Sequence, residues 1–113
     1  MATTTGEPLP SRGEVWWVWV DKRRPAIVVQ SDRLREPRVR SFLVVPLTSR
    51  LHLAGLPGTV RFDRRATGLP KASVANVYDL QKVLRSDLVE RVGRLDPPRL
   101  AALDEGLRLV LGL

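Results

Sequence analysis

The chain has 113 residues, of which 43% are hydrophobic and 27% are charged, and its formal net charge is +7. This is the size and composition of one globular domain. The absence of cysteine excludes disulfides and thiolate metal sites, and the longest apolar run, VWWVWV, is far too short to span a membrane. We therefore expect a cytoplasmic protein with no membrane partner.

The positive charge is concentrated in the first two thirds of the chain. Residues 1–71 hold thirteen Lys or Arg against six Asp or Glu, whereas residues 72–113 hold six of each sign. Arg outnumbers Lys sixteen to three, and the planar guanidinium suits bidentate binding of phosphate. The charge therefore favours a polyanionic partner, above all nucleic acid. An acidic protein partner, or a charge that serves only solubility, is the alternative.

The amino-terminal third predicts a short lead-in followed by a strand and a turn. Residues 1–11 lack the features of a signal peptide and are small, polar and proline-bearing, so we expect a disordered lead-in to a single domain over 12–113. Residues 13–20 are β-branched and aromatic with apolar side chains on both faces, which predicts a doubly buried strand. Residues 21–25 are expected to form a turn, in which Pro25 favours extended geometry for the preceding arginine.

Further strands are predicted in the middle of the chain. Residues 26–31 and 41–48 are almost continuously apolar and flank a charged loop over 32–40. We expect Pro46 to mark a sheet edge or the frayed end of its strand, because proline donates no ladder hydrogen bond. Residues 59–63 alternate apolar and charged side chains, which indicates a half-buried strand.

Basic turns and short strands are expected next. The connection over 49–58 and the loop over 64–71 contain glycine and proline at turn spacing. Residues 72–84 predict one or two short strands around Asp79. Residues 85–95 predict a helical turn and then a short strand.

The clearest helix is predicted at the carboxyl end, over 95–113. Asp96 suits the N-cap and Pro97 the first helical position. One apolar stripe recurs at helical spacing; it comprises Leu100, Leu103, Leu107 and Val110. Gly106 is expected to weaken this helix somewhat. Together the elements predict a mainly β protein, a small barrel or meander closed by one amphipathic helix, without βαβ alternation.

Several kinds of site are excluded or disfavoured by the residues present. The sequence contains no glycine-rich dinucleotide motif and no phosphate-binding loop of the GxxxxGK[ST] type. Its one histidine, His52, lies between leucines, where a loop or core-edge role is favoured over a general base. Carboxylate clusters for magnesium are also missing over 22–71. We therefore expect no metal site and no cofactor.

Two strand ends carry the candidate functional groups. Lys22, Arg23 and Arg24 precede Pro25 and the buried strand, so an arginine there is held more rigidly than one on a mobile loop. Thr48 ends another strong strand, which places its hydroxyl at the rim of the sheet. Ordinary roles also fit, since surface arginines solubilise turns and threonines commonly close strands.

Taken together, these segments resemble the MazF/PemK toxins of type II toxin–antitoxin pairs. The resemblance covers residues 12–113 and keeps the order and spacing of its motifs. These are RGEVWW, RRPAIVVQSD, VVPLTS, PGTVRF, SVANVYDLQ and LDPPRLAALDEGLRLVL. In many family members a longer, glycine-rich loop precedes the arginine; here only Asp21, Lys22 and Arg23 follow the first strand.

The resemblance implies a fold, an activity and partners. It implies a small SH3-like barrel with a carboxyl-terminal helix, which assembles as a homodimer and binds a cognate acidic antitoxin. It implies a metal-independent endoribonuclease that cuts single-stranded RNA, chiefly mRNA, leaving a 2′,3′-cyclic phosphate and a 5′-hydroxyl. The catalytic pair of the family falls on Arg24 and Thr48, while Gln81 and Ser73 match positions near the RNA groove.

Basic residues outside this pair are expected to hold the RNA backbone. Lys22 and Arg23 stand beside Arg24, and Arg64 and Arg65 open the basic loop over 64–71. Of the three tryptophans, which lie at positions 16, 17 and 19, we expect two in the core or in a dimer interface. Two other functions stay open. A non-catalytic barrel that binds nucleic acid or an acidic protein segment would use the same charge, and a gyrase-poisoning toxin of related fold is possible because fold alone does not fix function.

Overall fold

Seven antiparallel strands form one curved sheet in the computed structural model, which describes residues 9–113. The strands are β1 (Glu14–Trp19), β2 (Arg23–Val28), β3 (Ser41–Thr48), β4 (Val60–Phe62), β5 (Ser73–Ala75), β6 (Gln81–Leu84) and β7 (Leu88–Arg94). The helices are α1 (Arg64–Thr67) and α2 (Pro97–Leu111), with 3-10 turns η2 (Asp32–Leu34), η3 (Leu51–Gly55), η4 (Val77–Asp79) and η5 (Arg85–Asp87). The predicted mainly β class with a carboxyl-terminal helix is confirmed.

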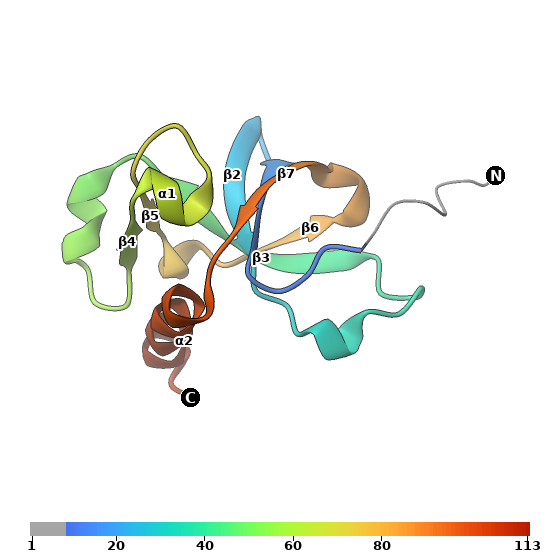
Figure 1. Cartoon of the computed structure of the whole chain (residues 1–113). Helices are drawn as coiled ribbons and strands as arrows, with labels where there is room; N and C mark the ends of the chain where they lie inside the picture. Colours follow the sequence, from blue (N-terminus) through green and yellow to red (C-terminus); the bar gives the residue numbers. More distant parts are fainter. Residues whose placement is uncertain (1–8) are drawn as a thin grey trace.

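The sheet curls around α2, which lies to one side of it (Figure 1). The strand order is β4-β5-β3-β2-β1-β7, and β6 also pairs with β3. On one side β3 pairs with β2; on the other it pairs first with β6 and then, through Leu47 and Thr48, with β5. The long strand β3 therefore joins the two halves of the sheet.

Pro46 lies inside this central strand, so the prediction of an edge or a frayed end is wrong. β3 spans the predicted residues 41–48 and is paired on both sides. Pro46 falls between the part that pairs with β6 and the part that pairs with β5. Its carbonyl accepts the backbone N–H of Asn76 at 3.0 Å. In a strand, the N–H and C=O of one residue point to the same side. The N–H that Pro46 lacks would therefore point toward the gap between β6 and β5, where no ladder hydrogen bond is lost.

Two local predictions need correction. β2 begins at Arg23, so part of the expected turn over 21–25 is strand; there β2 pairs with β1 alone, since its pairing with β3 starts at Ala26. The expected loop over 64–71 begins with the single-turn helix α1. Asp63 caps α1 by accepting the N–H of Ala66 at 2.9 Å, and Gly68 ends it at a φ of 84°.

The alternating side chains of β1, β2 and β3 form a core on each face of the sheet. On the face toward the helices, Val15, Ile27 and Val45 are fully buried with Leu103 of α2. The other face has its own cluster, which includes Val18 and Val28. Strands that are apolar on both faces are thus explained by burial on both faces.

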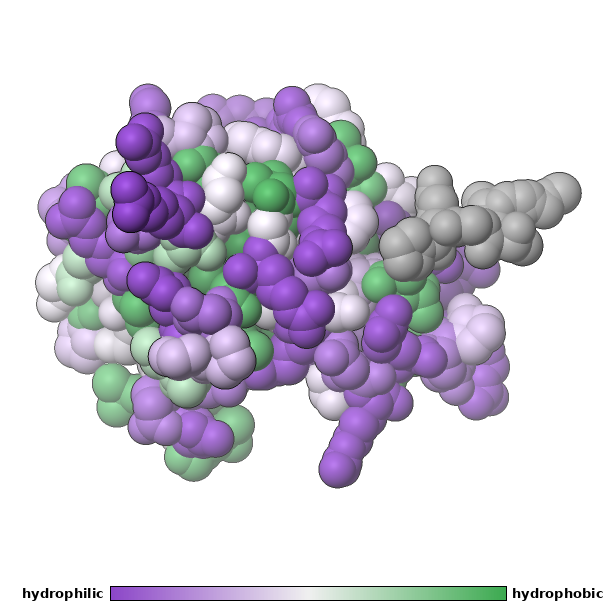
Figure 2. Space-filling view, in the orientation of Figure 1, coloured by the Kyte–Doolittle hydropathy of each residue, from purple (hydrophilic) through white to green (hydrophobic). Residues whose placement is uncertain are grey.

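The tryptophans of β1 divide between these cores and the surface. Trp17 packs against the first core and Trp16 against the second, as expected for two of the three tryptophans. Trp19 is 54% exposed. Figure 2 shows that the face seen in the orientation of Figure 1 is mostly hydrophilic, with smaller apolar areas.

The helix α2 has the predicted cap and the predicted apolar stripe. Asp96 accepts the N–H of Arg99 at 3.0 Å, and Pro97 opens the helix. The stripe packs toward the core. Gly106 also has a packing role: a β-carbon there would lie 2.0 Å from the carbonyl oxygen of Gly58. The residue that weakens the isolated helix is therefore the one that lets the helix approach the 56–58 turn.

Most of the expected lead-in, residues 1–8, lies outside the described residues. Leu9 packs against the second core, and its carbonyl accepts a hydrogen bond from Arg35 at 3.1 Å. The N–H of Ser11 donates to the Glu14 carboxylate at 2.8 Å. Over residues 9–113, no helix combines the length and the apolar character that crossing a bilayer requires.

Candidate active site

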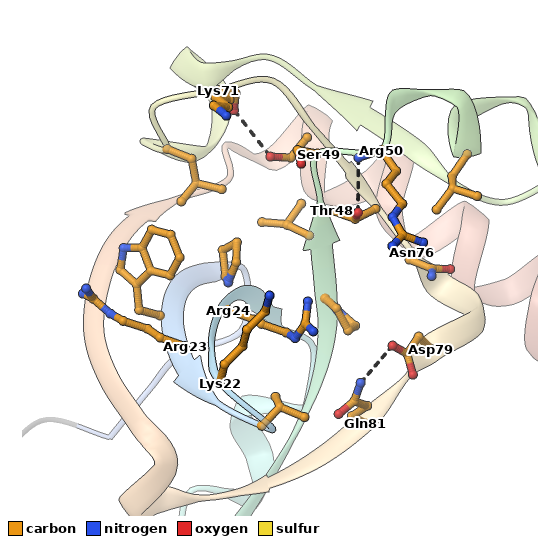
Figure 3. Close-up of a pocket in the computed structure, with 18 of the residues that line it drawn as sticks. Lys22, Arg23, Arg24, Thr48, Ser49, Arg50, Lys71, Asn76, Asp79 and Gln81 are labelled. Atoms are coloured by element: carbon orange, nitrogen blue, oxygen red, sulfur yellow. Dashed lines mark hydrogen bonds between the residues drawn. The ribbon is translucent and has the colours of Figure 1, made fainter.

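A groove of about 760 Å³ opens at one end of β2 and β3. It is lined by the β1–β2 turn with the start of β2, by residues 46–50 at the end of β3, and by parts of the segment 69–81. Figure 3 shows Lys22 and Arg24 projecting from the hairpin into the space bounded by Thr48, Asp79 and Gln81. Side chains from sequence-distant strands therefore share one open cavity.

The register of β2 and β3 brings Arg24 and Thr48 together. Ala26 pairs with Pro46 in this antiparallel ladder. Two residues beyond that pair, on the respective strands, stand Arg24 and Thr48, and both line the groove. Ala26 and Pro46 share a face of the sheet because they are paired, and residues two apart on a strand point to the same face, so Arg24 and Thr48 lie on that face as well.

Asp21 holds the Arg24 guanidinium from within the same turn. Its two carboxylate oxygens accept hydrogen bonds from Nε and Nη2 of Arg24 at 2.7 and 3.0 Å. These hydrogen bonds keep the pKa of Asp21 well below its usual range and raise the pKa of Arg24, to which the charge of Asp79 adds. Arg24 therefore stays protonated and acts as a fixed cation and hydrogen-bond donor.

The Thr48 hydroxyl is oriented by the chain that follows it. Its Oγ1 accepts the backbone N–H of Arg50 at 3.2 Å, the contact drawn as a dashed line in Figure 3. A hydroxyl that accepts one hydrogen bond keeps its own O–H to donate. Thr48 can therefore offer a proton donor to an anion bound beside Arg24.

Lys22 and Arg23 reach the groove in different states. The Arg23 guanidinium lies over the Trp17 ring, 4.8 Å from its centroid, and its Nη2 donates to Glu90 at 2.7 Å. The Lys22 ammonium has no ion pair or side-chain hydrogen bond with the part of the chain that the structure describes. Lys22 is thus the freer of the two to meet a phosphate, while Arg23 covers the indole.

Ser73 and Gln81 are the first residues of β5 and β6, the two strands that pair with β3. Ser73 is buried, and its hydroxyl donates to the carbonyl of Lys71 at 3.4 Å. Gln81 donates from Nε2 to Asp79 at 2.9 Å. Both line the groove, as the prediction requires, although their contact with RNA stays a prediction.

Arg64 and Arg65 are not brought to the groove. They lie on the exposed surface of α1, outside the residues that line the cavity. From the same basic stretch only residues 69–71 reach the groove, including Lys71. A contact of these two arginines with RNA therefore requires an RNA chain that extends beyond the groove, past Lys71.

Sequence reasoning missed other polar residues that line the groove: Asp21, Arg50, Asn76 and Asp79. Arg50 and Lys71 add unpaired cations, since neither side chain has an ion-pair or hydrogen-bonding partner among the described residues. The sequence indicated two of these residues only weakly, through their position. Arg50 stands two residues after Thr48 on the same segment, and Asp21 stands three before Arg24, a spacing that suits an ion pair in a tight turn.

His52 lies on the exposed turn η3 and does not line the groove. Across residues 9–113, no cluster of three or more histidine, cysteine or acidic side chains could hold a metal ion. The ionisable residues that line the cavity are aspartates, lysines and arginines. Its chemistry is that of binding and stabilising an anion.

Known proteins are similar to this chain in sequence and in fold. Endoribonuclease MazF6 of Mycobacterium tuberculosis is 35% identical over 111 residues, which covers 91% of this chain and 97% of that protein. The solved structure of the Mycobacterium tuberculosis toxin MazF-mt6 has a TM-score of 0.78 at 26% identity, covering 88% of this chain and 97% of that one. An endoribonuclease in complex with its cognate antitoxin, from a mycobacterial species, shares the fold with a TM-score of 0.77 at 20% identity, covering 93% and 97%.

The family match spans the groove and every strand around it. Residues 11–111 match the family described as PemK-like, MazF-like toxin of type II toxin–antitoxin system. That range includes both hairpin strands, the segment over 69–81 and the helix α2. The chain therefore belongs to the PemK/MazF toxin family.

Proposed function

We propose that the chain is the endoribonuclease toxin of a type II toxin–antitoxin pair. It cuts single-stranded RNA, chiefly mRNA, at short sequences and without a metal ion. The observation that carries the proposal is that Arg24 and Thr48, each two residues beyond the Ala26–Pro46 pair, line one cationic groove. Family membership and relatives named endoribonucleases support the reaction class.

RNA supplies the nucleophile for this reaction. The 2′-hydroxyl gives up its proton as its oxygen attacks the adjacent phosphorus, and the bond to O5′ breaks as O5′ takes up a proton. The products carry a 2′,3′-cyclic phosphate and a 5′-hydroxyl. Arg24 donates hydrogen bonds to the non-bridging oxygens, where negative charge grows, and Thr48 adds one from its hydroxyl. Loss of one such donor costs roughly 3–4 kcal/mol of transition-state stabilisation.

The free cations of the groove bind the RNA backbone. Lys22, Arg50 and Lys71 surround the Arg24–Thr48 pair and have no partners of their own in the described chain. Each can neutralise one phosphate and release one counterion. Gln81 offers an amide group that can bind a base edge, and the buried Ser73 also lines the groove, so we assign sequence preference to these residues.

A homodimer and an acidic antitoxin complete the proposed assembly. A second, mainly apolar hollow of about 290 Å³ beside α2 supports self-association; Val29, Leu43, Leu107 and Leu113 are among the residues that line it. The groove cations suit an acidic antitoxin segment that competes with RNA. We place this activity in the cytoplasm, where mRNA is exposed to it.

The test is a digest of mixed single-stranded RNA by the purified protein in EDTA. We expect cuts confined to a short sequence and lost in Arg24→Ala and Thr48→Ala. Arg99→Ala is the matched control, because Arg99 also pairs with a carboxylate three residues away but lies on α2 outside the groove. A requirement for added metal would contradict the proposed chemistry.

The two alternative functions give different results in the same experiment. Intact RNA with a retained gel shift would identify a non-catalytic binding protein. Intact RNA with inhibited gyrase would identify a gyrase poison. In either case the proposed nuclease is wrong.

A further inference from the structure

The turn between β1 and β2 contains a carboxylate that the proposed chemistry does not use. Asp21 follows the strand β1, and only Lys22 and Arg23 separate it from Arg24. The turn is closed by a backbone hydrogen bond from Val20 to Lys22 at 3.1 Å. Asp21 and Arg24 are therefore fixed at the two ends of one short, hydrogen-bonded turn.

The contact between them is bidentate and selective for one edge of the guanidinium. Asp21 accepts from Nε at 2.7 Å and from Nη2 at 3.0 Å. These contacts occupy two of the five N–H donors of arginine, so three donors, on Nη1 and Nη2, remain for another acceptor. The remaining edge can bind two phosphate oxygens while the Asp21 contact persists.

Stability alone does not account for this pair. The side chains of Arg24 and Asp21 are 44% and 66% exposed, and ion pairs this open to solvent contribute little to folding. The pair restricts rotation of the Arg24 side chain. Because this side chain is already held in place, it loses less conformational entropy when it binds an anion.

We propose that Asp21 is a positioning residue for RNA cleavage, holding the Arg24 guanidinium beside Thr48 with its outer edge toward the scissile phosphate. This rests on the proposed endoribonuclease function and adds a role to it. Asp21 does not touch the RNA; it acts through Arg24. Because its negative charge also opposes RNA binding, the proposal requires that its removal slows cleavage without weakening binding.

The experiment separates these two effects with one RNA in two forms. The first is an oligonucleotide that the wild-type protein cuts, used to measure kcat. The second carries a 2′-deoxynucleotide at the attacking position, cannot be cut, and gives Kd. Asp21→Ala removes the carboxylate, and Asp21→Asn keeps the shape but leaves only one acceptor oxygen for the two donors.

We expect kcat to fall roughly 10- to 100-fold in Asp21→Ala and less in Asp21→Asn, since a small misplacement of a catalytic group can cost about 100-fold. The Kd for the uncut RNA stays the same or tightens. Glu105→Ala is the control, because it removes an equal charge from an exposed pair with Arg108 on α2 outside the groove. Its kcat should equal that of the wild type.

A measurement without RNA guards against a folding defect. The 15Nε–Hε order parameter of Arg24 should be high in the wild type and should fall in Asp21→Asn while thermal unfolding stays unchanged. An unchanged or raised kcat in both Asp21 variants would overturn the proposal, as would a Kd for the uncut RNA that weakens in both. If the wild type itself cuts no RNA, the proposed function fails, which is a different result from an active wild type with unaffected variants.

Discussion

Arg24 on β2 and Thr48 on β3 each stand two residues beyond Ala26 and Pro46, the last pair of the β2–β3 ladder, and both line the groove. Neither residue depends on a long loop for its place. At these positions Thr48 pairs with Val74 of β5, and Arg24 pairs with Val18 of β1. Each residue is therefore held in a strand by backbone pairing.

Exchanging the Thr48 hydroxyl for a methyl group should separate its chemistry from its shape. Thr48→Val keeps the volume but removes the O–H donor, so we expect cleavage to slow by about 100-fold or more. Thr48→Ser keeps the donor and should stay within about tenfold of the wild type. Initial rates on a single cut site measure both. Equal rates for the Thr48→Val and Thr48→Ser variants would mean that the hydroxyl does not contribute to cleavage.

RNA binding should depend on salt through the free groove cations. Single changes of Lys22, Arg50 or Lys71 to alanine should each reduce the slope of log K against log salt by about 0.7, the value for one phosphate contact on a single strand. Arg61→Ala, on the exposed face of β4 outside the groove, should leave the slope unchanged. Fluorescence anisotropy over a salt series measures the slopes. A flat response in the wild type would rule out an electrostatic groove.

The close approach of α2 to the 56–58 turn should not tolerate a β-carbon at position 106. In Gly106→Ala that carbon would lie 2.0 Å from the carbonyl oxygen of Gly58. We expect the free energy of unfolding to fall by about 1–3 kcal/mol, despite the better helix propensity of alanine. Gly55→Ala, where a β-carbon meets nothing within 4 Å, is the control and should be nearly neutral. Urea unfolding of both variants measures the two changes in the free energy of unfolding.

The ion pair of Asp21 and Arg24 should persist to low pH. Its hydrogen bonds lower the pKa of Asp21, so the contribution of this pair is present above the usual carboxyl range, near pH 4, and is lost as the pH falls through the folded-state value. Between about pH 5 and 8 the pair should add no inflection to the cleavage rate. A carboxyl-detected NMR titration of Asp21 checks this, and a midpoint near or above 4 would contradict it.

Strand and helix positions followed closely from the sequence where the pattern was strong. The apolar run over 41–48 predicted β3 correctly, and the spaced leucines after Asp96 predicted α2. Pro46 misled the prediction because a proline in an inner strand is tolerated only where a neighbouring strand changes, and this depends on residues 73–84, far along the chain. Arg64 and Arg65 were expected in a loop because the cap by Asp63 and Gly68 was not recognised.

The candidate site could be predicted only in part for a related reason. The two strand ends were visible as RRP and LTS, but the β2–β3 register that brings Arg24 and Thr48 to one groove is a long-range property. The partners of Arg23 illustrate the limit. Glu90, which it contacts, lies 67 residues away on β7. Charge patterning alone counted Arg23 as free to bind RNA, whereas packing has already given it a carboxylate and an indole.

The contact between Gly106 and Gly58 ties the end of the chain to one wall of the groove. The turn that Gly106 meets also accepts, at Pro57, a hydrogen bond from the Tyr78 hydroxyl at 2.6 Å, and Tyr78 precedes Asp79. The packing of the final helix and the position of Asp79 in the groove lining are therefore linked through this one turn.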